Sequence, residues 1–148
     1  MFGDEPTRVL VFRMGHERFG IPLSDVHEVL DAQQIQRVPD ASNAVLGVTS
    51  IRGALTTVYD VRSLLSAGGD ANGALLVFSH GDRRIAVAID DVYDATLVEP
   101  SEVLSVPRRA ASDGLLTGML RRGSDLVAML DTNALLTAAI TDRQGDIR

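Results

Sequence analysis

The side chains that could do chemistry are few, and their spacing does not assemble a catalytic site. Three acidic residues cluster at Asp90, Asp91 and Asp94. Such carboxylates can serve acid–base catalysis or bind Mg²⁺. We expect them on a short helix, however, and acidic residues near a helix start complement its dipole. We therefore interpret them as a solvated helix face. A metal-dependent hydrolase or a ligand-binding sensor is the less favoured alternative.

The other reactive side chains form no recognisable motif. His16 and His80 fall in predicted hairpin turns, and His27 lies on a predicted short helix without a second histidine one turn away. The chain has no cysteine, which excludes thiolate metal sites and cysteine nucleophiles. All 14 basic residues are arginine, so there is no P-loop or Schiff-base lysine. The residues give no positive evidence of catalysis, and we predict no catalytic residue, metal site or cofactor.

Composition is ordinary for a globular domain, disfavours nucleic acid as a partner and predicts no membrane-spanning segment. The 148 residues are 45% hydrophobic and 23% charged. A formal net charge of −6 opposes binding to a phosphate backbone, and 4% aromatic residues without Trp offer no platform for bases. No stretch reaches the roughly 20 apolar residues that span a bilayer. The first residues are acidic where a signal peptide is basic. We expect a cytoplasmic protein without direct membrane insertion.

The second half of the sequence repeats the first. Residues 9–28 align without a gap with residues 75–94, and residues 58–65 align with 129–136. A repeat of roughly 70 residues that occurs only twice does not fit a solenoid. It indicates two copies of one small domain. The copies are joined by Ser66–Gly73, whose glycines and small polar residues are typical of a linker.

Each copy is predicted to contain two hairpins and helical turns. Short apolar runs on either side of polar, glycine-containing turns predict the hairpins. The paired runs are 8–12 with 19–23, 45–51 with 55–59, 74–78 with 85–89, and 115–120 with 126–130. Ser24 and Asp90 are predicted to cap one or two helical turns, and Asp60 and Asp131 to cap the helical segment that ends each copy. The pattern predicts a mostly β fold of two small barrels packed together.

One hairpin turn carries a family resemblance. By residue type alone, Arg52 fits equally a solvent-facing arginine and an arginine anchor of a protein interface. The segments Val45–Gly53 and Val58–Arg62, however, resemble the signature of the CheW family, in which Gly-Val-x-Asn-Leu-Arg-Gly precedes Pro-Val-x-Asp-Leu-Arg. Phe19–Leu23 is similar to the family's opening strand. The similarity extends over residues 8–140, which is nearly the whole chain.

The resemblance implies a fold with two pseudo-symmetric, five-stranded SH3-like barrels, packed together with short helices. We expect one domain at residues 8–140. Its subdomains are predicted at 8–65 and 74–140, joined by a linker at 66–73. Whether the subdomains exchange edge strands is left open by the sequence.

The resemblance also implies a function and contact residues. Family members are non-enzymatic adapters that couple chemoreceptors to a CheA-type histidine kinase in chemosensory arrays. The implied partners are the regulatory domain of that kinase and the cytoplasmic tip of a methyl-accepting chemoreceptor. Three of the positions carried over, Val26, Glu28 and Val29, are expected on a helix. The full predicted interface comprises Arg52, Gly47, Val26, Glu28, Val29, Ser50 and Val87.

Two departures from the family pattern motivate an alternative. Ser50 stands where the family has Asn, and Thr57 stands where it has Pro. Thr57 restores a strand N–H, which is harmless for pairing. Ser50 lacks an amide that could hold the arginine-bearing turn, so the choice of partner could differ. The alternative is a divergent paralogue that serves motility or another chemosensory pathway and binds only receptor or only kinase.

Overall fold

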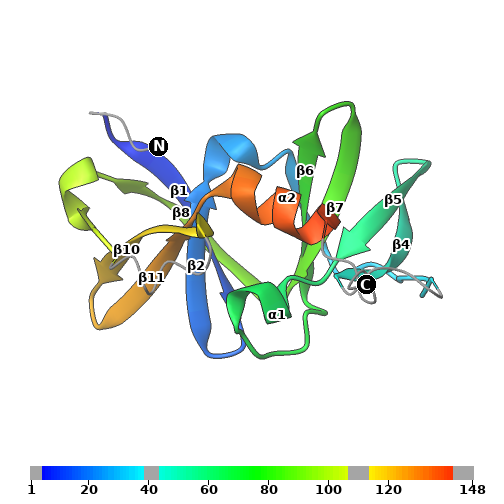
Figure 1. The fold of residues 1–148 in the computed structure, drawn as a ribbon, viewed down its shortest axis with the longest axis horizontal. Coiled ribbons are helices and arrows are strands. Elements are labelled where there is room, and N and C mark those ends of the chain that lie inside the picture. The colour runs from blue at the N-terminus through cyan, green and yellow to red at the C-terminus, as the bar shows by residue number, and fades with distance from the viewer. Residues whose placement is uncertain (1–4, 39–43, 107–113, 142–148) are drawn as a thin grey trace.

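The computed structural model describes residues 5–38, 44–106 and 114–141, and its strands form two packed sheets (Figure 1). The first sheet has the order β8-β1-β2-β11-β10-β9 and the second has the order β3-β6-β7-β5-β4. The strands of the first sheet are β1 (Thr7–Met14), β2 (Glu17–Pro22), β8 (Asp91–Val98), β9 (Val103–Leu104), β10 (Leu116–Arg122) and β11 (Asp125–Leu130). Those of the second sheet are β3 (Glu28–Asp31), β4 (Val45–Ile51), β5 (Ala54–Tyr59), β6 (Ala74–His80) and β7 (Arg83–Ile89).

Each sheet combines strands from both sequence repeats. The hairpin β1-β2 of the first repeat lies between β8 and β11 of the second, and the hairpin β6-β7 of the second repeat lies between β3 and β5 of the first. The two strands of each hairpin are antiparallel to each other. On one side each hairpin pairs in parallel with a strand of the other repeat, β2 with β11 and β7 with β5. The assignment of subdomains to residues 8–65 and 74–140 stays a prediction.

The apolar side chains form three layers, because successive residues of a strand point to opposite faces. The largest cluster lies between the sheets, where Phe12 and Phe19 stack at 5.8 Å and Phe78 contributes from the second sheet. A separate cluster within the first sheet contains Val11, and one within the second sheet contains Val77. The predicted mostly β, paired SH3-like class is confirmed. The sheets are open rather than closed barrels, and the first has six strands instead of five.

The helices predicted after the first hairpin of each copy do not form, so this prediction was wrong. After β2 the chain makes a single 3₁₀ turn, η1 (Leu23–Asp25), and then enters β3. After β7 it enters β8 without a helix. Both strands pair with the hairpin of the other repeat, β3 with β6 and β8 with β1. This long-range pairing overrides the local capping signal of Ser24 and Asp90.

The helices predicted at the end of each repeat are confirmed. The helix α1 (Arg62–Leu65) follows β5, and α2 (Thr132–Thr141) follows β11; both are in the front of Figure 1. Asp131 accepts a hydrogen bond from the N–H of Ala134 at 3.0 Å, as an N-cap does. Asp60 similarly accepts the N–H of Arg62 at 3.0 Å. A second 3₁₀ turn, η2 (Pro100–Glu102), precedes β9. No helix among the described residues is long and apolar enough to cross a membrane.

Candidate functional site

The turn between β4 and β5 presents Arg52 to solvent. Arg52 and Gly53 both have left-handed backbone conformations, with φ of +52° and +82°. Two such residues in succession match the right-handed twist of a two-residue hairpin. Glycine adopts this conformation freely, whereas for arginine it is strained. The Arg52 side chain is 73% exposed. The backbone thus holds a long cationic side chain at the exposed end of the second sheet.

Glu28, on β3, holds the Arg52 guanidinium through two hydrogen bonds. Nε donates to Oε1 at 3.2 Å and Nη2 donates to Oε2 at 2.6 Å. Glu28 is only 18% exposed, so the carboxylate is the fixed partner and the arginine the outward one. The hydrogen bond from Arg52 lowers the pKa of Glu28 below its usual value, and Glu28 raises the pKa of Arg52. Nη1 donates no hydrogen bond within the described part of the chain, which leaves an edge of the guanidinium for an external carboxylate.

An exposed leucine lies in the same hairpin as this arginine. Leu55 is 77% exposed and pairs with Ser50 across the β4-β5 hairpin. Ser50 is itself exposed, so both residues are available on the outer face of the sheet. Val29 is exposed on β3, where it follows Glu28 and points to the opposite face. An exposed arginine beside exposed leucine is the composition of a protein-binding surface rather than a catalytic one.

Two of the predicted interface residues are buried and have structural roles. A Cβ on Gly47 would lie 2.3 Å from the carbonyl oxygen of Gln36, because the backbone of Gln36 pairs with Val48 directly over this position. Val87 is 1% exposed and lies in the cluster between the sheets. Val87 therefore presents no surface to a partner in this structure, in contrast to its predicted place in the interface. Its place in a strand that is apolar on both faces was the available signal.

The predicted contact residues Val26, Glu28 and Val29 do not lie on a helix. Val26 ends the η1 turn, is half-buried and packs against the core between the sheets. Glu28 and Val29 belong to β3. The structure therefore brings Glu28 together with Arg52, and places Val26 and Val29 on other faces.

The acidic cluster is divided between two roles. Asp90 accepts hydrogen bonds from the backbone N–H groups of Gly15 at 2.6 Å, Asp70 at 3.0 Å and Ala71 at 2.6 Å. Burial would raise the pKa of Asp90, but these three donors outweigh it and lower the pKa. Asp90 thus fastens the linker to the β1-β2 turn. Asp91 and Asp94 are exposed on β8 and not at a helix start, which corrects their predicted position.

Metal binding finds no support in the described ranges. No group of three or more His, Cys, Asp or Glu side chains there is placed to hold a metal ion. His16 and His27 are exposed, and His80 is half-buried at the end of β6. His27 follows η1 rather than lying on a helix, and its backbone N–H bonds to the carbonyl of Val77.

The fold and this surface together define a paired SH3-like β domain with an exposed arginine at one end. A family model described as "CheW-like domain" matches residues 8–139. The chain belongs to the CheW-like domain family.

Comparison with individual proteins agrees with this family. The chain is 26% identical over 134 residues to the chemotaxis protein CheW of Klebsiella aerogenes, covering 87% of this chain and 81% of that protein. It is 30% identical over 134 residues to the protein FrzA of Myxococcus xanthus, covering 86% and 84%. The crystal structure of the scaffolding protein TtCheW from Thermoanaerobacter tengcongensis superimposes with a TM-score of 0.75 at 17% identity, covering 85% of this chain and 89% of that one. The last similarity concerns the fold alone.

Proposed function

We propose that this protein is a non-enzymatic adapter that couples chemoreceptors to a CheA-type histidine kinase at cytoplasmic or membrane-associated receptor arrays. Its family supports this role, because relatives are named as chemotaxis and scaffolding proteins. The observation that carries the proposal is the Arg52–Glu28 pair at the exposed end of the second sheet. A guanidinium already held in place loses less conformational freedom on binding than a free arginine would.

Two faces would serve two partners. The regulatory domain of the kinase would contact the β4-β5 end, where Arg52 meets a partner carboxylate and Leu55 is covered by apolar side chains. The receptor tip would contact the face that carries Val26 and Val29. Small interfaces of this kind suit a transient array and are consistent with weak pairwise affinity.

The test is direct binding of the full-length protein to the regulatory domain of each CheA-type kinase of the same genome, and separately to a receptor-tip fragment. We expect Arg52→Glu to weaken kinase binding by roughly 30-fold or more, as loss of an interface arginine does. Arg121→Glu is the matched control, because it reverses the charge of an exposed arginine on the first sheet. Equal binding by the two variants would refute the role of Arg52.

A divergent paralogue is the second candidate. The substitutions Ser50 and Thr57 in the signature favour it, as does the 30% identity to FrzA, a relative that is not named CheW. Such a protein would bind only the kinase or only the receptor. Paired titrations with the two fragments separate the candidates, since an adapter binds both and this paralogue binds one.

A further inference from the structure

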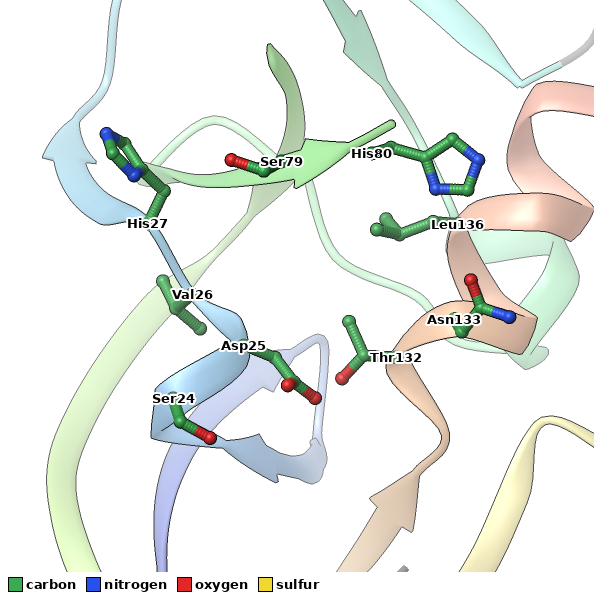
Figure 2. Close-up of a pocket in the computed structure, with 9 residues that line it drawn as sticks. All are labelled: Ser24, Asp25, Val26, His27, Ser79, His80, Thr132, Asn133 and Leu136. Atoms are coloured by element: carbon green, nitrogen blue, oxygen red, sulfur yellow. The ribbon is translucent and has the colours of Figure 1, made fainter. Parts of the chain in front are cut away.

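The two repeats form two equivalent clefts beside the helices α1 and α2, and within the described residues a chain segment crosses only one of them, which we call the filled cleft. The open cleft lies between η1, the end of β6 and the start of α2, and has a volume of about 460 Å³. Figure 2 shows the side chains that line this cleft, which come from these three elements and the residues next to them. The residues that line it are Ser24, Asp25, Val26, His27, Ser79, His80, Thr132, Asn133 and Leu136.

The linker occupies the equivalent cleft beside α1. The alignment of the repeats places Asp90 at the position of Ser24 and Arg62 at the position of Asn133. The carboxylate of Asp90 accepts linker N–H groups from Asp70 and Ala71, and Nη1 of Arg62 donates to the carbonyl of Gly69. The filled cleft therefore recognises a peptide main chain from both sides.

The filled cleft also selects for glycine. A Cβ on Gly69 would lie 1.9 Å from Oδ2 of Asp90, and a Cβ on Gly73 would lie 1.7 Å from the carbonyl oxygen of Asp90. The linker lies so close to Asp90 that side chains at these two positions would collide with Asp90. The filled cleft therefore requires glycine at the two positions where the segment lies closest to Asp90.

The open cleft has polar groups at the same places, but none of the described residues cross it as the linker crosses the other cleft. The helix α1 ends after one turn at Ser66, whose left-handed backbone returns the chain over the cleft, whereas α2 continues for ten residues. Asp25 and Asn133 are exposed and form no side-chain hydrogen bond with other described residues. Thr132, on the same wall, is only 9% exposed and its Oγ1 has no partner among them.

We propose that the open cleft binds an extended, glycine- and alanine-rich segment of a partner protein through its main chain. Ser24 and Asp25 would accept the N–H groups of that segment, as Asp90 does for the linker. The amide of Asn133 would donate to a carbonyl, as Arg62 does. The cleft is separate from the Arg52 end, so the inference is independent of the proposed kinase contact, but it shares Val26 with the face proposed for the receptor tip.

The test uses the full-length protein and a capped, fluorescent octapeptide that copies Ser66–Gly73. We expect weak but saturable binding by fluorescence polarisation. The double variant Ser24→Asp with Asn133→Arg recreates the filled cleft and should bind roughly tenfold more tightly, because both new hydrogen bonds are charge-assisted. A peptide with valine in place of its three glycines should bind roughly tenfold more weakly, because the added side chains clash.

Thr137→Arg is the control, because it adds the same charge at an exposed position one turn farther along α2. It should bind the peptide as the wild type does. Backbone amide shifts on titration should be confined to residues 24–27, 79–80 and 132–136. Three results would overturn the proposal: no saturable binding by either folded protein, equal binding of the valine peptide, or shifts centred on Gly15 and Asp90, which would mean displacement of the linker.

Discussion

Each repeat has an arginine paired with a carboxylate near the turn of its second hairpin, but the two arginines have different roles. Arg52 lies in the β4-β5 turn, its side chain is 73% exposed, and that side chain donates hydrogen bonds to Glu28 alone among the described residues. Arg122 ends β10, is 38% exposed and donates to the carbonyl of Leu97 at 2.8 Å and to Glu102 at 3.3 Å. The Nε atom of Arg122 is buried and has no hydrogen-bond partner among the residues that the structure describes. One repeat therefore directs its guanidinium outward, and the other uses it to fasten β8 and η2 to β10.

The comparison shows how a duplicated domain separates binding from stability. The repeats keep the same strand order and the same close contact over β4 and β10, while the arginine moves by one position into or out of the turn. That shift decides whether the arginine side chain points to solvent, where a partner can bind it, or forms hydrogen bonds with other strands and turns of the fold. It places the proposed kinase contact on the second sheet.

The largest expected effect on stability concerns the close backbone approach at a glycine that both repeats share. A Cβ would lie 2.3 Å from a backbone oxygen at Gly47 and 2.9 Å from one at Gly118. We expect Gly47→Ala and Gly118→Ala each to lower the free energy of unfolding by about 3 kcal/mol, since the opposing backbone must move. Urea denaturation measures this. Wild-type stability in either variant would show that the crossing segment does not hold that close position.

A smaller effect distinguishes the two clefts. Asp90→Asn should lower the free energy of unfolding by about 2 kcal/mol at neutral pH, because a carboxylate held by three N–H groups becomes a weaker acceptor. Ser24→Ala, at the equivalent position in the open cleft, should have almost no effect.

The pH dependence of Asp90 follows from its pKa. The folded-state pKa is lowered below the ordinary 3.8, so the stabilisation is complete above that value and is lost as the pH falls through the folded pKa. The difference between wild type and Asp90→Asn should stay constant from neutral pH down to about pH 5 and shrink in more acidic solution. A difference that grows below pH 4 would contradict this.

The smallest expected effect separates the arginines by stability. Arg122→Gln should lower the free energy of unfolding by about 1 kcal/mol, because it removes hydrogen bonds to Leu97 and Glu102. Arg52→Gln should leave the melting temperature nearly unchanged, because exposed ion pairs contribute little. Thermal unfolding of both variants checks this, and a larger loss in Arg52→Gln would make that arginine structural.

The hairpins could be predicted from sequence and the sheets could not. The runs 45–51 and 55–59 match β4 and β5 closely, because apolar residues flank a glycine-containing turn. The helix expected after Asp90 is wrong because β8 pairs with β1, which lies far away in the sequence. The exchange of hairpins between repeats depends on such long-range choices, which local propensity does not encode.

The site residues likewise divide into those that could be predicted from the sequence and those that could not. Arg52 and Glu28 were predicted through the family resemblance, and the structure joins them directly. The role of Asp90 was missed because its donors are 19 to 75 residues away in the sequence. The burial of Val87 was indicated by the unbroken apolar run of its strand, a signal that the resemblance outweighed.

The most direct test of the account compares Arg52→Gln and Arg122→Gln in one titration against the regulatory domain of the kinase that binds wild type. Both variants lose one charge, and both are compared at a temperature where they are folded. The account predicts that Arg52→Gln weakens binding by roughly tenfold or more, while Arg122→Gln binds as wild type does. Weaker binding in Arg122→Gln with unchanged binding in Arg52→Gln would contradict it and move the interface to the first sheet.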